Sequence, residues 1–257
     1  SNQPLMKHLI LLVYLALAGL TTLHAADESK PNIVFIFADD WGWGDLSCHG
    51  HPWLKTPNLD RLASEGTDFQ QFNVLNPVCS PSRTAAMTGL YPARFCIHQH
   101  FAPGVNVERG MPDWLDPKAP TVARFLKSAG YRTGHFGKWH LTNTGAPGAP
   151  QLAEYGFDES AVFNGPGDGK SQAKTDATAD NAVRFIRESK GRPFFVNVWI
   201  HESHTPHRPT KESMEKWKHL DEQKQVYAAV ITDGENDVGK VLAALKETGV
   251  EDNTIVL

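Results

Sequence analysis

The feature that most constrains the fold is an uninterrupted apolar run, IVFIFA, at residues 33–38. Branched and aromatic side chains at consecutive positions are typical of a strand covered on both faces, as central strands of parallel sheets are. A second run, at residues 194–200, is apolar except at Asn197, and strand-like segments lie at 67–74, 131–136 and 253–257. The sequence therefore predicts a mostly parallel sheet.

Helical segments alternate with these strands. Thr56 and Pro57 are a capping residue and a first-turn proline, and Gly66 ends the helix that they begin. Further helices are predicted at residues 81–88, 121–129, 176–188 and 223–246. This alternation predicts an α/β fold with a doubly wound, mostly parallel sheet flanked by helices, which binds ligands at the carboxyl ends of its strands.

The charge balance argues against a nucleic-acid partner. Lys and Arg together number 25 and Asp and Glu 29, so the formal net charge is -4. A protein with this balance has no overall positive field to attract phosphates. An anionic substrate would have to be held by local positive charge.

The first residues are typical of an export signal. Lys7 precedes an apolar run at residues 9–20, and two alanines follow it. Because a membrane-spanning helix needs roughly 20 apolar residues, we expect residues 1–26 to be a signal peptide and not a stable membrane anchor. Residues 1–5, which precede the first methionine, are interpreted as an extension. The protein is then expected to be secreted or periplasmic.

Such a compartment is oxidising, and the chain has three cysteines, Cys48, Cys79 and Cys96. An odd number leaves at least one thiol unpaired. A bond between Cys48 and Cys96 would leave Cys79 free, although the sequence does not assign the pairing. Of the three, Cys79 has the most unusual neighbours.

Two adjacent aspartates, Asp39 and Asp40, directly follow the first apolar run, where the chain leaves the sheet. Their carboxylates repel each other unless a cation lies between them. A hard divalent ion with oxygen ligands, such as Ca²⁺ or Mg²⁺, fits this pair better than zinc does. The alternative is an ordinary acidic turn, and the pair alone does not decide between the two.

Residues 79–83 read CSPSR. We interpret Ser80 as a capping residue and Pro81 as the first helical residue, with Cys79 just outside the helix. A helix start presents unsatisfied N–H groups and the positive end of the dipole, and Arg83 on the first turn adds a fixed charge. The segment predicts an anion pocket beside a sulfur nucleophile; a buried structural cysteine or half of a disulfide is the alternative.

Two further clusters follow strands at the same predicted edge. In GKWH, Lys138 and His140 lie two residues apart, so an extended segment would point both to one side. This would set a cation beside a titratable imidazole, whereas a surface lysine and a capping histidine are the alternative. The segment HESHTPH at 201–207 carries three histidines, but in a proline-containing loop their spacing is not that of a helical zinc motif.

Taken together, the aspartate pair and CSPSR, continued by TAAMTGLYPAR at residues 84–94, resemble the sulfatase family. These formylglycine-dependent enzymes belong to the alkaline phosphatase superfamily. The resemblance implies an alkaline phosphatase-like fold and hydrolysis of aryl or carbohydrate sulfates. It also implies a maturation enzyme that oxidises Cys79 to formylglycine, whose hydrate is the nucleophile.

The resemblance further implies a role for each candidate residue. Arg83 and Lys138 would hold the charge of the sulfate, and His140 would act as a base on a formylglycine hydroxyl. His204, which precedes a Thr-Pro pair, would contact the sulfate or the leaving group. The metal, Ca²⁺ in preference to Mg²⁺, would be bound by Asp39, Asp40 and the group at Cys79.

Other residues are assigned less sharply. His201 and His207 are interpreted as rim residues only. Aromatic residues near the predicted edge could line a sugar-binding rim: Trp41, Trp43, His98 and His100. The alternative is that they pack in the core or lie on the surface without a role in binding.

The resemblance covers residues 30–257 but only the front portion of a typical sulfatase. In the family, an Asp and an Asn that complete the metal site follow the strand matching residues 253–257, and a smaller C-terminal subdomain comes later. We therefore expect an incomplete catalytic domain. The alternatives are a phosphodiester or phosphonate hydrolase of the same superfamily, and an inactive homologue that only binds its ligand.

Overall fold

The computed structural model of the protein describes residues 30–143, 145–165 and 177–257. The segment predicted to be a signal peptide lies outside these residues. Residues 31–257 form one folded unit. None of the described helices combines the length and apolar character needed to cross a bilayer.

The centre of this unit is a five-stranded sheet in the order β3-β2-β4-β1-β5, in which every pairing is parallel. The strands are β1 (Asn32–Ile36), β2 (Arg132–Lys138), β3 (Glu159–Phe163), β4 (Phe194–Trp199) and β5 (Thr254–Val256). The prediction of a parallel, doubly wound sheet is confirmed.

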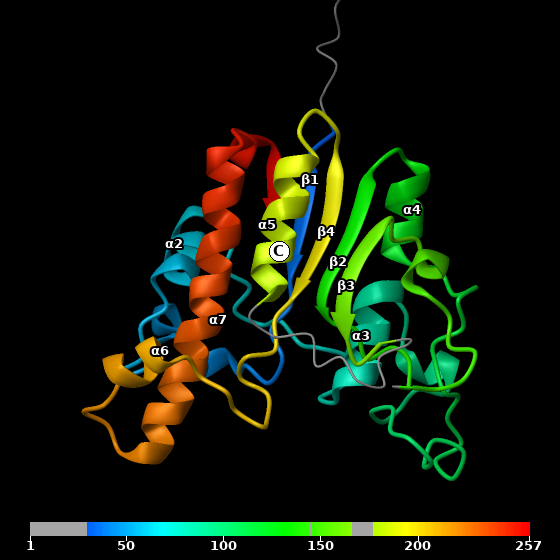
Figure 1. Ribbon diagram of the computed structural model, residues 1–257, viewed down its shortest axis with the longest axis horizontal. Helices are drawn as coiled ribbons and strands as arrows, with labels where there is room; N and C mark the ends of the chain where they lie inside the picture. The colour runs from blue at the N-terminus through cyan, green and yellow to red at the C-terminus, as the bar shows by residue number, and fades with distance from the viewer. Residues whose placement is uncertain (1–29, 144, 166–176) are drawn as a thin grey trace, which may run out of the picture. The chain divides into compact units, whose positions relative to one another are not determined.

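Helices cover both faces of the sheet. Figure 1 shows α5 and α7 on one side and α3 and α4 on the other. The helices are α2 (Pro57–Glu65), α3 (Cys79–Thr88), α4 (Val122–Ser128), α5 (Thr178–Glu188), α6 (Lys211–Lys216) and α7 (Glu222–Glu247). Short 3₁₀ turns are η1 (Trp43–Asp45), η2 (Ser47–His49), η3 (Pro92–Phe95), η4 (Leu152–Tyr155) and η6 (Glu251–Asn253).

Each central strand contributes to two hydrophobic cores because successive side chains point to opposite faces. Val34 and Val196 belong to the core under α5 and α7. Phe35 and Trp199 pack in the opposite core, which includes Met87 of α3. This double burial explains why β1 and β4 are predominantly apolar in the sequence, with Asn197 the exception within β4.

One sequence prediction about the sheet was wrong, and one strand was missed. Residues 67–74 form no strand, and Phe69 and Phe72 on this segment are exposed. The strand β3 was missed because only one of its five residues is buried, so its sequence lacks the long apolar run that marks β1 and β4.

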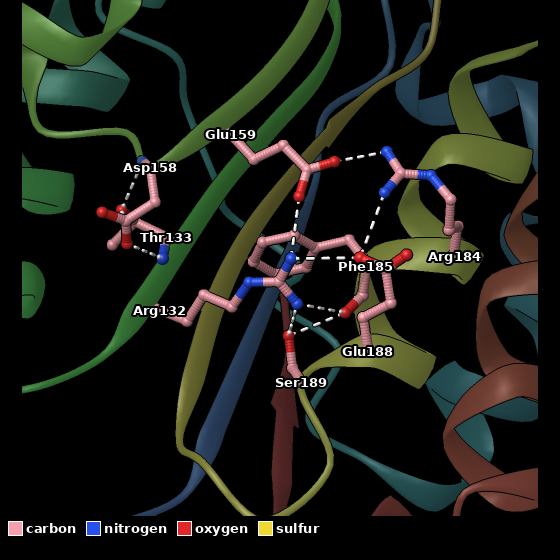
Figure 2. A network of polar contacts seen from close by, with 8 residues as sticks. All are labelled: Arg132, Thr133, Asp158, Glu159, Arg184, Phe185, Glu188 and Ser189. Atoms are coloured by element: carbon pink, nitrogen blue, oxygen red, sulfur yellow. Dashed lines mark hydrogen bonds and ion pairs between the residues drawn. The ribbon is translucent and has the colours of Figure 1, made fainter.

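A polar network fastens the sheet edge formed by the amino ends of β2 and β3 (Figure 2). Arg132 donates to Glu159 at 2.8 Å, to Ser189 at 2.9 Å and to Glu188 at 3.2 Å, and its guanidinium lies 4.3 Å from the Phe185 ring centroid. The network ties both strands to the end of α5. The candidate site residues lie at the opposite edge, where the strands end.

Candidate active site

Asp39 follows β1 and is the most heavily contacted carboxylate of the site. Its Oδ2 lies 2.6 Å from Lys138 Nζ and 2.5 Å from His201 Nδ1, and its Oδ1 lies 3.2 Å from an Arg83 nitrogen. Asp39 is 4% exposed. Burial raises its pKa, but the His201 hydrogen bond and the charges of Arg83 and Lys138 outweigh this and hold the pKa well below its usual range. Asp39 is therefore a carboxylate at neutral pH.

Two buried cations accompany this carboxylate. Lys138 is the last residue of β2, and Arg83 lies on α3; neither side chain is exposed to solvent. Arg83 donates to the Lys138 carbonyl at 3.2 Å, and its guanidinium lies 4.9 Å from the Trp199 ring centroid. Burial lowers the Arg83 pKa, opposed chiefly by the charge of Asp39. The predicted gathering of positive charge near the aspartates is present.

Cys79 and His140 form the second part of the site. The Cys79 Sγ lies 3.2 Å from His140 Nδ1, and His140 Nε2 lies 3.0 Å from the Phe101 carbonyl oxygen. Because a carbonyl only accepts, the proton of the neutral ring is on Nε2 and the Nδ1 lone pair faces Cys79. Burial and the charge of Lys138 lower the His140 pKa to about 3, which keeps the imidazole neutral.

The start of α3 differs from the prediction. The helix begins at Cys79, with Val78 at the capping position, so Ser80 is not the cap. The Ser80 hydroxyl instead accepts the Phe101 N–H at 3.1 Å in a buried position. Cys79 nevertheless lies on the first turn, where backbone N–H groups and the helix dipole favour an anion.

The backbone between Lys138 and His140 is not the extended segment expected. His140 has a φ of 49°, so Lys138 reaches Asp39 while His140 turns to Cys79. Gly137, just before, has a φ of 102°, and a Cβ there would lie 2.1 Å from the Trp199 carbonyl oxygen. Only glycine fits this position, which aims both functional side chains.

The loop at residues 201–207, the histidine loop, differs from its interpretation from the sequence. His201, expected to be a rim residue only, bonds Asp39 directly, and its ring stacks on that of His204 with centroids 4.4 Å apart. The His204 Nδ1 lies 2.6 Å from the Thr205 carbonyl oxygen, and its Nε2 lies 3.9 Å from the Asp40 carboxylate. His207 contacts the Ser203 carbonyl oxygen at 2.9 Å. His201 is the second residue after β4, at a strand end that the strand-end rule could have singled out.

Asp39 and Asp40 provide part of the ligand set that a divalent cation needs. Asp39 is buried and ionised, and Asp40, with a φ of 59°, is exposed. Candidate ligand atoms of Asp39, His201 and His204 lie within 4.8 Å of one another. Carboxylate oxygens are suited to Ca²⁺ or Mg²⁺, but Ca²⁺ takes 6–8 oxygen ligands. Asp39 and Asp40 therefore provide a beginning of such a site and not its full set of ligands.

The remaining candidates lie at the margin. Trp41 packs on the core, whereas Trp43 is 55% exposed and stacks on His49 with ring centroids 4.2 Å apart. The His98 Nε2 contacts the Arg109 carbonyl oxygen at 2.9 Å, and the His100 ring centroid is 6.4 Å from that of His140. Within the described residues all three cysteines are free thiols, so the Cys48–Cys96 bond considered from the sequence is not formed.

Comparisons with known proteins identify the family. The family model described as Sulfatase matches residues 31–257. The chain is 30% identical to N-acetylgalactosamine-6-sulfatase of Canis lupus familiaris over 96% of this chain and 52% of that protein. It thus spans about half the length of the curated relatives it matches.

Solved structures share the fold. The crystal structure of Ps i-CgsB in complex with k-i-k-neocarrahexaose has a TM-score of 0.76 and 30% identity, covering 89% of this chain and 57% of that chain. Phosphonate monoester hydrolase of Agrobacterium radiobacter has a TM-score of 0.64 and 21% identity, covering 88% and 61%. The second likeness concerns the fold alone.

Proposed function

Because this chain belongs to the sulfatase family, we propose that it hydrolyses sulfate esters with a nucleophile made from Cys79. The observation that carries the proposal is the contact between Cys79 Sγ and His140 Nδ1 at 3.2 Å, on the first turn of α3. It joins a nucleophile position, a neutral base and a helix start in one place. Acyl- and phosphoryl-transfer sites use the same combination of parts.

The proposed nucleophile is formylglycine, produced from Cys79 by a maturation enzyme. When formed, its hydrate would supply one hydroxyl that attacks sulfur as the alcohol of the ester leaves, and a second hydroxyl whose deprotonation would expel the sulfate and return the aldehyde. The Cys79 Sγ stands where these hydroxyls would be. The His140 Nδ1 lone pair faces this position and accepts the proton, as a general base does.

Arg83 and Lys138 would bind the negatively charged sulfate group of the substrate. Arg83 lies one turn along α3 from Cys79, and the Lys138 ammonium forms an ion pair with the Asp39 carboxylate. A buried cation stabilises a developing negative charge more strongly than an exposed cation does, because little water screens the interaction. His204, whose ring stacks on that of His201, would contact the sulfate or the leaving group.

Asp39 and Asp40 would hold the divalent cation, which we propose to be Ca²⁺ because both donors are carboxylates. The cation would polarise the oxygen atoms of the nucleophile and the sulfate. Asp39 is prepared for this task because its pKa lies far below neutrality. His201, hydrogen-bonded to the same carboxylate, orients it.

We propose a sulfated glycan as the substrate class and a site of action outside the cytoplasm. The name N-acetylgalactosamine-6-sulfatase and the oligosaccharide complex of Ps i-CgsB support the first. The N-terminal pattern Lys7, apolar run and alanines supports the second. N-terminal sequencing of protein recovered from the periplasm or medium tests export, and an uncleaved cytoplasmic product would contradict it.

The test of the reaction is a comparison of two esters. The protein is coexpressed with a formylglycine-generating enzyme, and hydrolysis of an aryl sulfate and of the matching aryl phosphate is measured with and without Ca²⁺. We expect the sulfate ester to be hydrolysed faster than the phosphate ester, and His140→Gln to lower the rate of sulfate release by about 10²-fold or more. Preferred hydrolysis of the phosphate would instead support the superfamily alternative, and hydrolysis of neither ester would support an inactive homologue.

A further inference from the structure

We propose that Ser80 is a positioning residue, which acts through the backbone of Phe101 to hold His140 in the tautomer whose bare nitrogen faces position 79. The catalytic consequence rests on the proposed function, since it takes His140 as the base. The tautomer itself does not depend on any reaction. Ser80 touches neither the nucleophile position nor the imidazole through its hydroxyl.

Four residues close a ring of hydrogen bonds. The Ser80 Oγ accepts the Phe101 N–H at 3.1 Å, and the Phe101 carbonyl oxygen accepts the His140 Nε2–H at 3.0 Å. The His140 Nδ1 then faces Cys79 Sγ at 3.2 Å. Cys79 and Ser80 are neighbours on α3, so the helix completes the ring.

Three of the four residues are buried, which makes the hydrogen bonds between them consequential, whereas Cys79 is half-buried. Ser80 is 0% exposed, Phe101 3% and His140 9%. A buried N–H that loses its acceptor costs more than the bond itself contributed, so the Phe101 amide strongly favours a position next to the Ser80 hydroxyl. That position restrains the backbone of Phe101, whose carbonyl oxygen bonds His140.

The Phe101 carbonyl oxygen determines which nitrogen of the His140 imidazole carries the proton. Since it only accepts, it requires the proton on His140 Nε2, and this leaves Nδ1 as the acceptor toward position 79. If Phe101 were displaced, the proton would be free to lie on Nδ1. His140 would then present a donor to position 79 and would be unable to accept a proton there.

Nitrogen-15 NMR of the protein with Cys79 unconverted tests this directly, because two-bond couplings distinguish the two tautomers of a neutral histidine. The unsubstituted protein must show His140 as the Nε2–H form. In Ser80→Ala we expect the ratio of Nε2–H to Nδ1–H forms to fall by about fivefold, which is what one neutral hydrogen bond supports. For formylglycine-containing protein, normalised to its aldehyde content, we expect kcat to fall with little change in KM.

Ser189→Ala is the matched control. Ser189 is also buried, at 1% exposure, and its hydroxyl donates to the Phe185 carbonyl oxygen at 2.7 Å at the opposite edge of the sheet. It should cost stability without altering the His140 tautomer. An Nδ1–H form in the unsubstituted protein, or an unchanged tautomer ratio in Ser80→Ala, would overturn the proposal, whether or not the protein hydrolyses sulfate esters.

Discussion

The ammonium group of Lys138 lies 2.6 Å from the carboxylate of Asp39, and both side chains are buried. The two residues come from the carboxyl ends of β2 and β1, which are separated in the sheet by β4. Their ion pair therefore spans the end of β4, where the histidine loop begins, and draws three strand ends into one site.

Breaking this pair should be costly. Lys138→Met leaves the Asp39 carboxylate buried with fewer partners, and we expect the free energy of unfolding to fall by about 3 kcal/mol. Urea denaturation measures it. Asp39→Asn combined with Lys138→Met should recover part of the loss, because neither charge is then left unpaired; losses that simply add would contradict the coupling of the two residues.

Gly137→Ala should be more damaging than an ordinary glycine substitution. The new Cβ would meet the Trp199 carbonyl oxygen at 2.1 Å, so we expect a loss of about 3 kcal/mol or more in the free energy of unfolding. Gly50→Ala is the control, since Gly50 also has a positive φ but open space around it. There the loss should be about 1–2 kcal/mol. Similar losses at both positions would show that the clash is not what requires glycine at 137.

Stability should fall in mild acid partly because of His135. This histidine is fully buried, hydrogen-bonded to the Lys138 carbonyl at 3.3 Å and to Asn197 at 3.1 Å. Burial, with a smaller effect of the Arg83 charge, lowers its pKa to about 3. Because the folded pKa lies below the unfolded value of about 6.5, this contribution is complete above pH 6.5 and is lost as the pH falls toward 3.

The unsubstituted protein should therefore lose about 2 kcal/mol more of its unfolding free energy between pH 7 and pH 5 than His135→Gln does. Urea titrations at the two pH values measure the difference. Equal pH dependence in His135→Gln and the unsubstituted protein would show that His135 takes up no extra proton on unfolding.

Calcium binding should depend on the aspartate pair. Asp39→Asn and Asp40→Asn each remove one anionic oxygen ligand, and we expect Ca²⁺ affinity to weaken by about tenfold or more in either variant. Calorimetric titration measures it. Asp252→Asn, an exposed carboxylate on η6, makes the same change of net charge and should leave the affinity unaltered. Unchanged binding in Asp39→Asn would place the ion elsewhere.

The sequence predicted the parts of the fold whose physics is local and strong. β1 and β4 are covered on both faces, so their apolar runs were sufficient evidence, and the strand-end rule brought Asp39 and Lys138 to one edge. β3 lies at the margin of the sheet and is mostly half-buried, so its sequence carries a weaker pattern. Residues 67–74 show strand-like composition, but their aromatic side chains are exposed and no strand forms.

Within the site, the sequence predicted the residue types but not every contact. His201 and His204 lie in a loop whose course the spacing does not determine, so the bond between His201 and Asp39 emerged only from the structure. The left-handed backbone of His140 likewise emerged only from the structure, because no residue pattern in GKWH indicates it. The contribution of the Phe101 backbone leaves no mark in a motif, because any residue has a carbonyl group.

The most direct test of the central claim relates turnover to the chemistry at position 79. Protein batches with different degrees of maturation are analysed by peptide mass spectrometry for formylglycine at position 79 and assayed for aryl sulfate hydrolysis. We expect the rate per molecule to rise in proportion to the formylglycine fraction and to vanish in Cys79→Ala. Equal rates in unconverted protein or in Cys79→Ala would show that Cys79 does not supply the nucleophile.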